Sequence, residues 1–210
     1  MAPVAHEWVV ASLPEWDEER VEGGLAELER GSLLTVERLL GEENRTGYLL
    51  HALIRAFFAA KLETELAAGA EALRRGMAQA LTEVAKTIPQ TVTLGDLARV
   101  QEAIPHLAVV AEGWTHLLTD SVDVLWAFIG LARVAEGQSR WQDAEYWNTQ
   151  CLSVSEDRFG SNHPDTAISL NNLALLYESM GRYSEAEPLY LRSLTIREQQ
   201  LGAEHPDTAL

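Results

Sequence analysis

The C-terminal part of the chain repeats itself with a period of forty-two residues. The segment His163-Pro164-Asp165, which follows Gly160, reappears as His205-Pro206-Asp207, which follows Gly202. A fixed period is typical of repeat proteins, in which each unit buries its apolar face by stacking on a neighbour. The second copy ends where a third would begin, so we expect an array that stops within a repeat. We therefore expect function on a surface and not in a catalytic pocket.

Each copy shows apolar residues at helical spacing, interrupted once by a short polar stretch. The interruptions lie near Gln138-Ser139-Arg140 and near Gly181-Arg182. Small residues recur at equivalent positions of the two copies, where a neighbouring helix would cross closely, and large residues lie beside them. Each copy is therefore predicted to be two antiparallel helices joined by a tight turn.

The second copy, from Leu170-Asn171-Asn172-Leu173-Ala174 to Gly181-Arg182-Tyr183-Ser184-Glu185-Ala186, resembles a tetratricopeptide repeat of the kinesin-light-chain type. The resemblance covers about residues 123–210, and the first copy diverges more, with Ala135 where a tyrosine is usual and Asn148 where an aromatic residue is usual. It implies a right-handed superhelix whose first helices line a concave groove for an extended peptide. The groove positions it implies are Ile168, Asn171, Asn172, Leu175, Glu178 and Ser179, with Trp126, Ile129, Arg133 and Glu136 one repeat earlier.

Several elements are expected before the repeats. The run from Ser32 to Leu39 and the run Tyr48-Leu49-Leu50 flank a turn-rich stretch and predict a hairpin, followed by a buried helix over Ala52 to Leu62. Glu63 to Lys86 predicts a long helix that Ile88-Pro89 ends. Thr93 and Asp96 offer N-terminal capping for a helix to about Ala103, and Pro105 suits the first turn of a helix to Leu118.

Within this upstream part, Ser32-Leu33-Leu34 and Tyr48 to Phe58 resemble the end of the winged-helix module in signal-transduction ATPases of the NB-ARC class. In that family a histidine at the position of His51 senses the phosphate of bound ADP, and an acidic residue usually follows this histidine. In this chain Ala52 follows His51 instead. The chain has no Gly-x-x-x-x-Gly-Lys phosphate loop. The resemblance implies a regulatory C-terminal part of such a nucleotide-switch ATPase, acting with a separate nucleotide-binding partner, and this is our alternative function.

Charge and cysteine content exclude several classes of protein. The formal net charge is −16, and carboxylates outnumber basic residues in residues 1–60, 61–120 and 121–210 alike. Binding to nucleic acid or to an anionic membrane requires lysines and arginines, so both are disfavoured. Cys151 is the single cysteine, which excludes an internal disulfide and suits a reducing cytoplasm. We find no export signal and no apolar run long enough to span a membrane.

Residues that invite a chemical role have simpler explanations. His163 and His205 lie a full repeat apart, too distant to share one metal ion, and Asp165 and Asp207 suit N-caps or first-turn acids of the helices that follow. Cys151 lies at a packing position with no histidine arranged beside it. A hydrolase using His51 with Glu42 or Glu43 lacks any nucleophile motif. We therefore predict no enzyme, no metal and no cofactor.

The groove residues also have two interpretations. The amides of Asn171 and Asn172 can donate and accept together, which suits them to hold a peptide backbone, although either could instead form an inter-repeat hydrogen bond. Arg133 could pair with an acidic peptide side chain or could simply be solvated.

The prediction is an all-α fold: a small winged-helix-like remnant (1–62), a helical linker with a degenerate repeat-like hairpin (63–121), then a tetratricopeptide solenoid (122–210). The solenoid comprises repeats at about 122–163 and 164–205 and the start of a third. Its predicted function is non-catalytic: a scaffold that binds a protein or an extended peptide in the repeat groove. Self-association through the last, uncapped helix pair is also expected.

Overall fold

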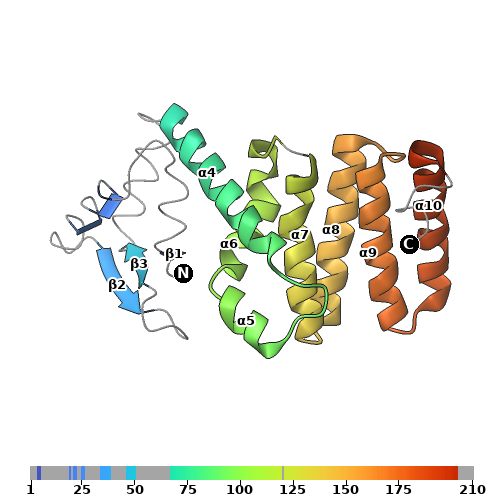
Figure 1. Cartoon of the computed structure of the whole chain (residues 1–210), viewed down its shortest axis with the longest axis horizontal. Coiled ribbons are helices and arrows are strands. Elements are labelled where there is room, and N and C mark those ends of the chain that lie inside the picture. Colours follow the sequence, from blue (N-terminus) through green and yellow to red (C-terminus); the bar gives the residue numbers. More distant parts are fainter. Residues whose placement is uncertain are drawn as a thin grey trace. The chain divides into compact units, whose positions relative to one another are not determined.

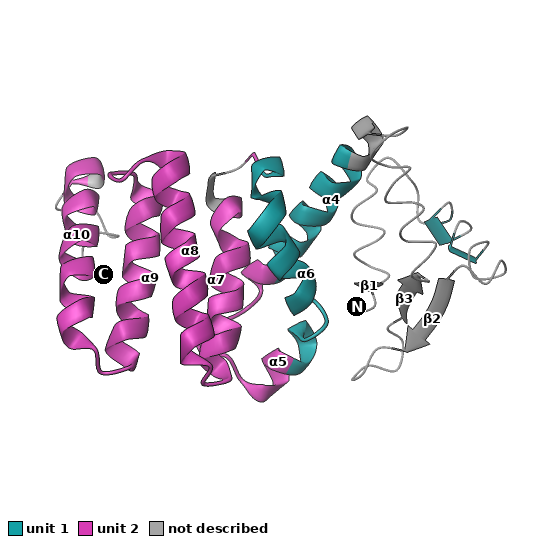
Figure 2. Cartoon of the chain, turned by 180° about the vertical axis from the view of Figure 1, so that it is seen from behind, with its two compact units in different colours: residues 1–84, 98–118 teal, residues 85–97, 119–210 magenta. Residues whose placement is uncertain are grey.

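The computed structural model describes residues 4–5, 19, 21–22, 25–26, 34–38, 46–50, 67–119 and 121–202. The expectations for His51, the helix over 52–62 and the second His-Pro-Asp segment at 205–207 lie outside these residues. The described chain forms two compact units, residues 1–84 with 98–118 and residues 85–97 with 119–210, coloured separately in Figure 2. The repeats lie in the second unit.

A small antiparallel sheet is present in the first unit. Strand β2 (Leu34–Arg38) pairs with β3 (Thr46–Leu50), with Leu34 opposite Leu50 and Arg38 opposite Thr46, which confirms the predicted hairpin. Strand β1 (Val4–Ala5) pairs with the other edge of β3 and was not predicted. All other regular structure in the described part of the chain is helical, so the predicted all-α class is confirmed.

The helices that precede the repeats begin and end at the expected signals. Helix α4 (Ala67–Lys86) stops before Pro89. Helix α5 (Leu94–Val100) begins with a reciprocal cap, in which the Asp96 amide donates to Thr93 Oγ1 and the Thr93 amide donates to Asp96 Oδ2. Pro105 lies in the first turn of α6 (Ile104–Val109), which continues as a π-helical turn, η1 (Val110–Trp114), and a 3₁₀ turn, η2 (Thr115–Leu117). The sequence did not indicate this change of helix type.

Four helices follow in two hairpins, α7 (Ser121–Gly137) with α8 (Trp141–Phe159) and α9 (Pro164–Ser179) with α10 (Tyr183–Leu201). They lie side by side in chain order (Figure 1): α7 packs on α8, α8 on α9 and α9 on α10, and α7 also contacts α9. The predicted pairs of antiparallel helices, with turns at 138–140 and at 180–182, are confirmed.

The two hairpins have the same local geometry, as a true repeat requires. Gly160 and Gly202 end α8 and α10 with the same φ of 94°, a left-handed value that favours glycine. In each tight turn the amide of an arginine donates to a carbonyl five residues earlier at 2.8 Å, Arg140 to Ala135 and Arg182 to Tyr177. The second turn places Gly181 at a φ of 72°, whereas the first places Ser139 at 57°.

Small residues at the helix crossings allow the repeats to pack closely. One buried cluster joins Ala135 and Ala144 of the first hairpin to Leu173 and Leu176 of the second. A second cluster, Ala167, Leu170 and Ile196, lies between α9 and α10, and Leu152 from α8 packs against both clusters. The core is therefore continuous across the two repeats, as expected for a solenoid whose units cannot fold alone.

The segment 85–97 belongs to the same unit as the repeats and covers the start of the array. A Cβ atom added at Gly130 of α7 would lie 3.1 Å from the Ala85 Cβ, so glycine permits a close approach of helix and segment. Lys86 forms an ion pair with Asp123 at 2.6 Å. The upstream segment therefore packs against α7, the first helix of the repeats.

Candidate peptide-binding groove

A hollow in the second unit lies between the first helices of the two repeats, where the sequence predicts a groove. Its lining comes from α7, α8, α9 and the segment before α7, namely Gln90, Ile129, Ala132, Arg133, Glu136, Asn148, Asn172 and Leu175. Five of the ten predicted groove residues are brought together here: Ile129, Arg133, Glu136, Asn172 and Leu175. Gln90, Ala132 and Asn148 were not predicted.

Arg133 is already engaged by its own chain. Its Nη1 donates to the Ile88 carbonyl at 2.7 Å, and its guanidinium lies 5.4 Å from the centroid of the Trp126 ring. Burial lowers the pKa of Arg133, and the nearby Glu136 opposes that shift. The arginine therefore holds the segment before α7 against the groove wall, and it pairs there with no carboxylate within salt-bridge distance in the described chain. Its predicted role toward an acidic peptide stays a prediction.

Glu136 and Asn148 form the polar floor of the hollow. Asn148 is buried and donates to Glu136 Oε1 at 3.4 Å, a long hydrogen bond. Burial raises the pKa of the Glu136 carboxyl above its usual value, and the Asn148 hydrogen bond and the charge of Arg133 oppose this only in part. Glu136 is therefore a weakly satisfied acceptor that faces the groove.

The other five predicted residues lie outside the hollow. Trp126 stacks under Arg133, as described above. Ile168 is exposed, and Asn171 is half-buried without lining the hollow. Ser179 Oγ donates to the Leu175 carbonyl at 2.9 Å, while Glu178 accepts a 2.6 Å hydrogen bond from the Tyr190 hydroxyl. Of the two asparagines, only Asn172 lines the hollow.

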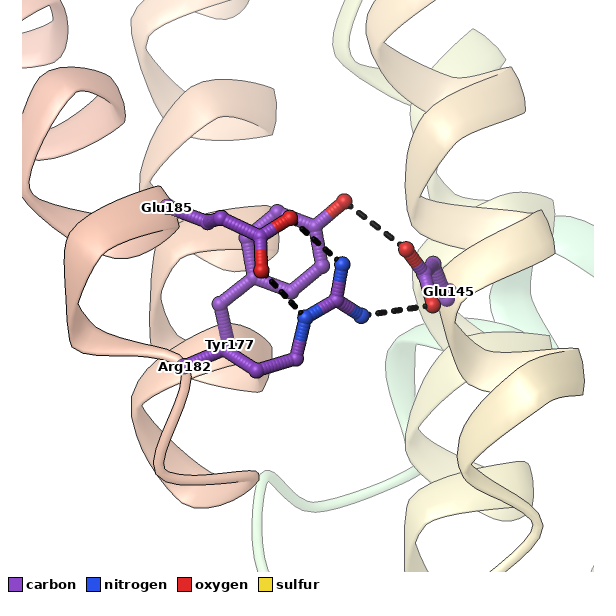
Figure 3. Close-up of polar contacts among 4 residues, drawn as sticks. All are labelled: Glu145, Tyr177, Arg182 and Glu185. Carbon is purple, nitrogen blue, oxygen red and sulfur yellow. Dashed lines mark hydrogen bonds and ion pairs between the residues drawn. The ribbon is translucent and has the colours of Figure 1, made fainter.

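A second polar group joins the two repeats and is shown in Figure 3. Glu145 on α8 accepts from the Tyr177 hydroxyl at 2.9 Å and from Arg182 Nη1 at 2.9 Å. Arg182 also pairs with Glu185 at 2.6 Å and lies 4.1 Å from the centroid of the Tyr177 ring. The hydrogen bond from Arg182 lowers the pKa of Glu145, and Glu185 and Glu145 raise the pKa of Arg182.

The turn between the repeats uses its histidine and aspartate to begin a helix. His163 is the N-cap of α9, and its Nδ1 accepts a hydrogen bond from the Asp165 amide at 3.2 Å. Pro164 and Asp165 occupy the first turn, as the sequence predicts for this acid. No group of three potential metal ligands is found among the residues described.

Cys151 lies at a crossing of α8 and α9, in the packing position that the sequence predicts. It is buried, its sulfur lies 3.4 Å from Ser169 Oγ, and burial raises the pKa of its thiol to about 12. A thiol that stays protonated at neutral pH is a poor nucleophile. Its role is therefore to pack two helices together.

The comparisons with known proteins identify the repeats. The family model described as tetratricopeptide repeat matches residues 124–165 and 166–207, within two residues of the predicted limits. These segments are tetratricopeptide repeats, each formed by one of the two helical hairpins. The match supports a tetratricopeptide repeat protein, and repeats of this family generally mediate contacts between proteins. A search of curated proteins gave no match. No helix of the described residues is long and apolar enough to cross a membrane.

Proposed function

We propose that the chain is a non-catalytic binding module whose hollow between α7 and α9 holds an extended segment of a partner protein. The observation that supports this most directly is the state of Asn172. Its side chain is half-buried at the hollow and forms no hydrogen bond with any residue that the structure describes. An amide that faces a groove without a partner can donate to and accept from one peptide unit of a ligand.

The rest of the hollow suits a peptide backbone with apolar side chains. Ile129, Ala132 and Leu175 offer apolar walls, and Gln90 and Asn148 add amide groups. Arg133 and Glu136 contribute opposite charges, so the lining is neutral overall although the chain is strongly acidic. Such a surface favours a ligand chosen by its hydrogen-bonding groups and shape over one chosen by net charge alone.

The test compares the two neighbouring asparagines. A twelve-residue peptide is selected from a random displayed library against the full chain, labelled with a dye, and titrated by fluorescence anisotropy. Asn172→Ala is expected to weaken binding about 3- to 10-fold, the effect of losing one hydrogen bond of about 0.7–1.4 kcal/mol. Asn171→Ala, which changes the adjacent residue outside the hollow, is the matched control and is expected to bind as the parent does. Equal affinity of the parent, Asn172→Ala and Asn171→Ala for the peptide would show that the hollow is not the peptide-binding site.

The alternative function, a regulatory part of an NB-ARC-type switch ATPase, is supported by the β2–β3 hairpin, which lies where the winged-helix resemblance requires one. It is tested by thermal unfolding of the full chain with and without ADP or ATP. A nucleotide-dependent rise in Tm would favour the alternative function, and an unchanged Tm would favour the binding module.

Two finer proposals accompany the binding module. The kinesin-light-chain resemblance of the second repeat, together with the buried free thiol of Cys151, supports a protein scaffold in the reducing cytoplasm. Self-association through the second repeat is tested by sedimentation at high concentration, where a strictly monomeric mass would count against it.

A further inference from the structure

Glu136 is an acid that the neighbouring arginine leaves without a cation. Arg133 lies three residues before it on α7, but the two side chains form no ion pair. The repeats hold two other arginines with an acid three residues later, and both pair with it (Figure 3 shows the second): Arg140 with Asp143 at 2.5 Å and Arg182 with Glu185 at 2.6 Å. The separation of Arg133 from Glu136 therefore needs a cause.

The segment before α7 determines where the arginine points. A Cβ atom added at Gly130 would lie 3.1 Å from Ile88 Cδ1, and one added at Gly137 would lie 2.8 Å from Val92 Cβ. Between these two close approaches, Arg133 Nη1 donates to the Ile88 carbonyl at 2.7 Å. The segment thus takes up the guanidinium that could have paired with the acid.

Two oxygens at the floor of the hollow are left without a donor as a result. Glu136 accepts one hydrogen bond from the described part of the chain, the 3.4 Å contact with Asn148. Asn148 is buried and lines the hollow, and its carbonyl oxygen accepts no hydrogen bond from the residues described. Burial raises the pKa of the Glu136 carboxyl, because the carboxylate loses water without gaining an equivalent partner. A ligand that brings donors would recover this free energy.

The size and walls of the hollow indicate which donor fits. Its volume is about 30 Å³, room for about two water-sized groups, which suits an ammonium better than the larger, planar guanidinium. Ile129 and Leu175 form apolar walls beside the polar floor. A lysine side chain has the matching form, since its methylene stem packs on apolar surface while its ammonium reaches a polar partner. The N-terminal amine of a peptide has no such stem.

We propose that the hollow receives a lysine side chain of the partner segment. Its ammonium donates to the Glu136 carboxylate and to the Asn148 carbonyl, and its stem packs between Ile129 and Leu175. Asn172 then binds a peptide unit of the same segment. The assignment rests on the binding function proposed above and adds the side chain that the segment must present. The net charge of −16 attracts a cationic segment.

The test uses the peptide selected against the full chain, acetylated at its N-terminus and dye-labelled at its C-terminus, so that lysine side chains are its only amines. Affinities are measured at about 0.15 M salt, where long-range attraction by the acidic chain is screened. The peptide is expected to contain a lysine whose acetylation weakens binding to the parent about tenfold or more, the effect of losing hydrogen bonds to a charged group. In Glu136→Gln, the same acetylation is expected to weaken binding by no more than about twofold.

Glu187→Gln is the matched control for the loss of one negative charge. Glu187 is exposed on α10 and does not line the hollow. This variant is expected to respond to lysine acetylation as the parent does. If Glu187→Gln and Glu136→Gln reduce the effect of acetylation equally, the lysine binds through the charge of the whole chain, and the assignment to the hollow is wrong.

The pH dependence of affinity gives a second readout. Glu136 must be ionised to bind an ammonium, while Arg133, the other ionisable group of the lining, stays protonated below pH 8. The segment before α7, α8 and α9 contribute only Gln90, Asn148, Asn172 and Leu175, which do not titrate. Affinity of the parent is therefore expected to rise between about pH 5 and pH 7.5, more than that of Glu136→Gln. The same pH dependence in both chains would contradict the proposal.

The possible outcomes distinguish the lysine assignment from the binding function itself. A peptide that depends on Asn172 but lacks lysine, or tolerates acetylation of every lysine, would contradict the lysine assignment alone. Replacement of the lysine by arginine without loss of affinity would also argue against it, because the hollow would then not select by size. If no selected peptide binds in an Asn172-dependent way, both the binding function and the lysine assignment fail.

Discussion

Exchanging the residues of the two tight turns is expected to shift stability in opposite directions. Ser139 and Gly181 occupy equivalent positions, and both have a left-handed backbone, with φ of 57° and 72°. Glycine adopts this conformation freely, whereas a residue with a Cβ atom is strained in it. Gly181→Ser is therefore expected to destabilise the chain, and Ser139→Gly to stabilise it.

The structure isolates the backbone contribution to these changes. A Cβ atom added at Gly181 meets no atom within 4 Å, so no steric clash adds to the cost. The Ser139 side chain is exposed and forms no hydrogen bond with the residues described, so its removal loses no contact. Left-handed strain costs about 1–2 kcal/mol, and the greater freedom of glycine in the unfolded chain offsets about 0.4–1 kcal/mol of it. We expect Gly181→Ser to lower the free energy of unfolding by about 1 kcal/mol and Ser139→Gly to raise it by about 0.5 kcal/mol.

Urea unfolding of the full chain, followed by circular dichroism at 222 nm, measures both changes. Gly113→Ser is the control, because Gly113 also has open space around its Cα but no positive φ. It is expected to leave the midpoint unchanged or to raise it slightly. The argument fails if Gly181→Ser costs no more than Gly113→Ser, or if Ser139→Gly destabilises the chain.

Three further predictions concern single side chains. Arg182→Met is expected to lower Tm more than Arg140→Met, because Arg182 donates a hydrogen bond to Glu145 of the first repeat, whereas Arg140 pairs with Asp143 of its own hairpin. Added salt is expected to reduce this difference in Tm, and equal shifts for the two variants would argue against an inter-repeat role of Arg182. Burial raises the pKa of Glu136 in the folded chain. The side chain therefore contributes to the free energy of unfolding in full below the unfolded pKa of about 4.3, and this contribution is lost as pH rises through the folded pKa. Glu136→Gln is therefore expected to be most favourable, relative to the parent, at neutral pH, in urea midpoints measured from pH 4.5 to 7.5; a constant difference would contradict this. Cys151 is expected to react with a thiol reagent at pH 8 only after urea unfolding, and rapid labelling of the folded chain would contradict its burial.

Local signals predicted the helices well because each depends on near neighbours in sequence. The breaks at residues 138–140 and 181–182, the cap at Thr93 and the stop before Pro89 are all short-range effects, and the structure has each of them. The π-helical turn at 110–114 and the pairing of β1 with β3 have no such signal, because the first is a local departure from a regular pattern and the second joins strands far apart in sequence.

The groove shows the same division between local and tertiary information. The resemblance to a tetratricopeptide repeat implied Ile129, Arg133, Glu136, Asn172 and Leu175 as groove residues, and these five line the hollow. It did not indicate Asn148, which comes from a second helix and reaches the hollow only through the crossing of α8 with α7 and α9.

The sequence by itself determined that this protein is built from two like helical hairpins, because a forty-two-residue period and a helical apolar pattern permit little else. Only the tertiary structure decided which partner each side chain has. Arg133 donates to the Ile88 carbonyl, and Glu145 accepts from Tyr177 and Arg182, whereas Glu187 and Glu198 of α10 are exposed to solvent. The physical reason is that a helix period gives the direction of a side chain, whereas its partner depends on how closely and at what angle the helices cross.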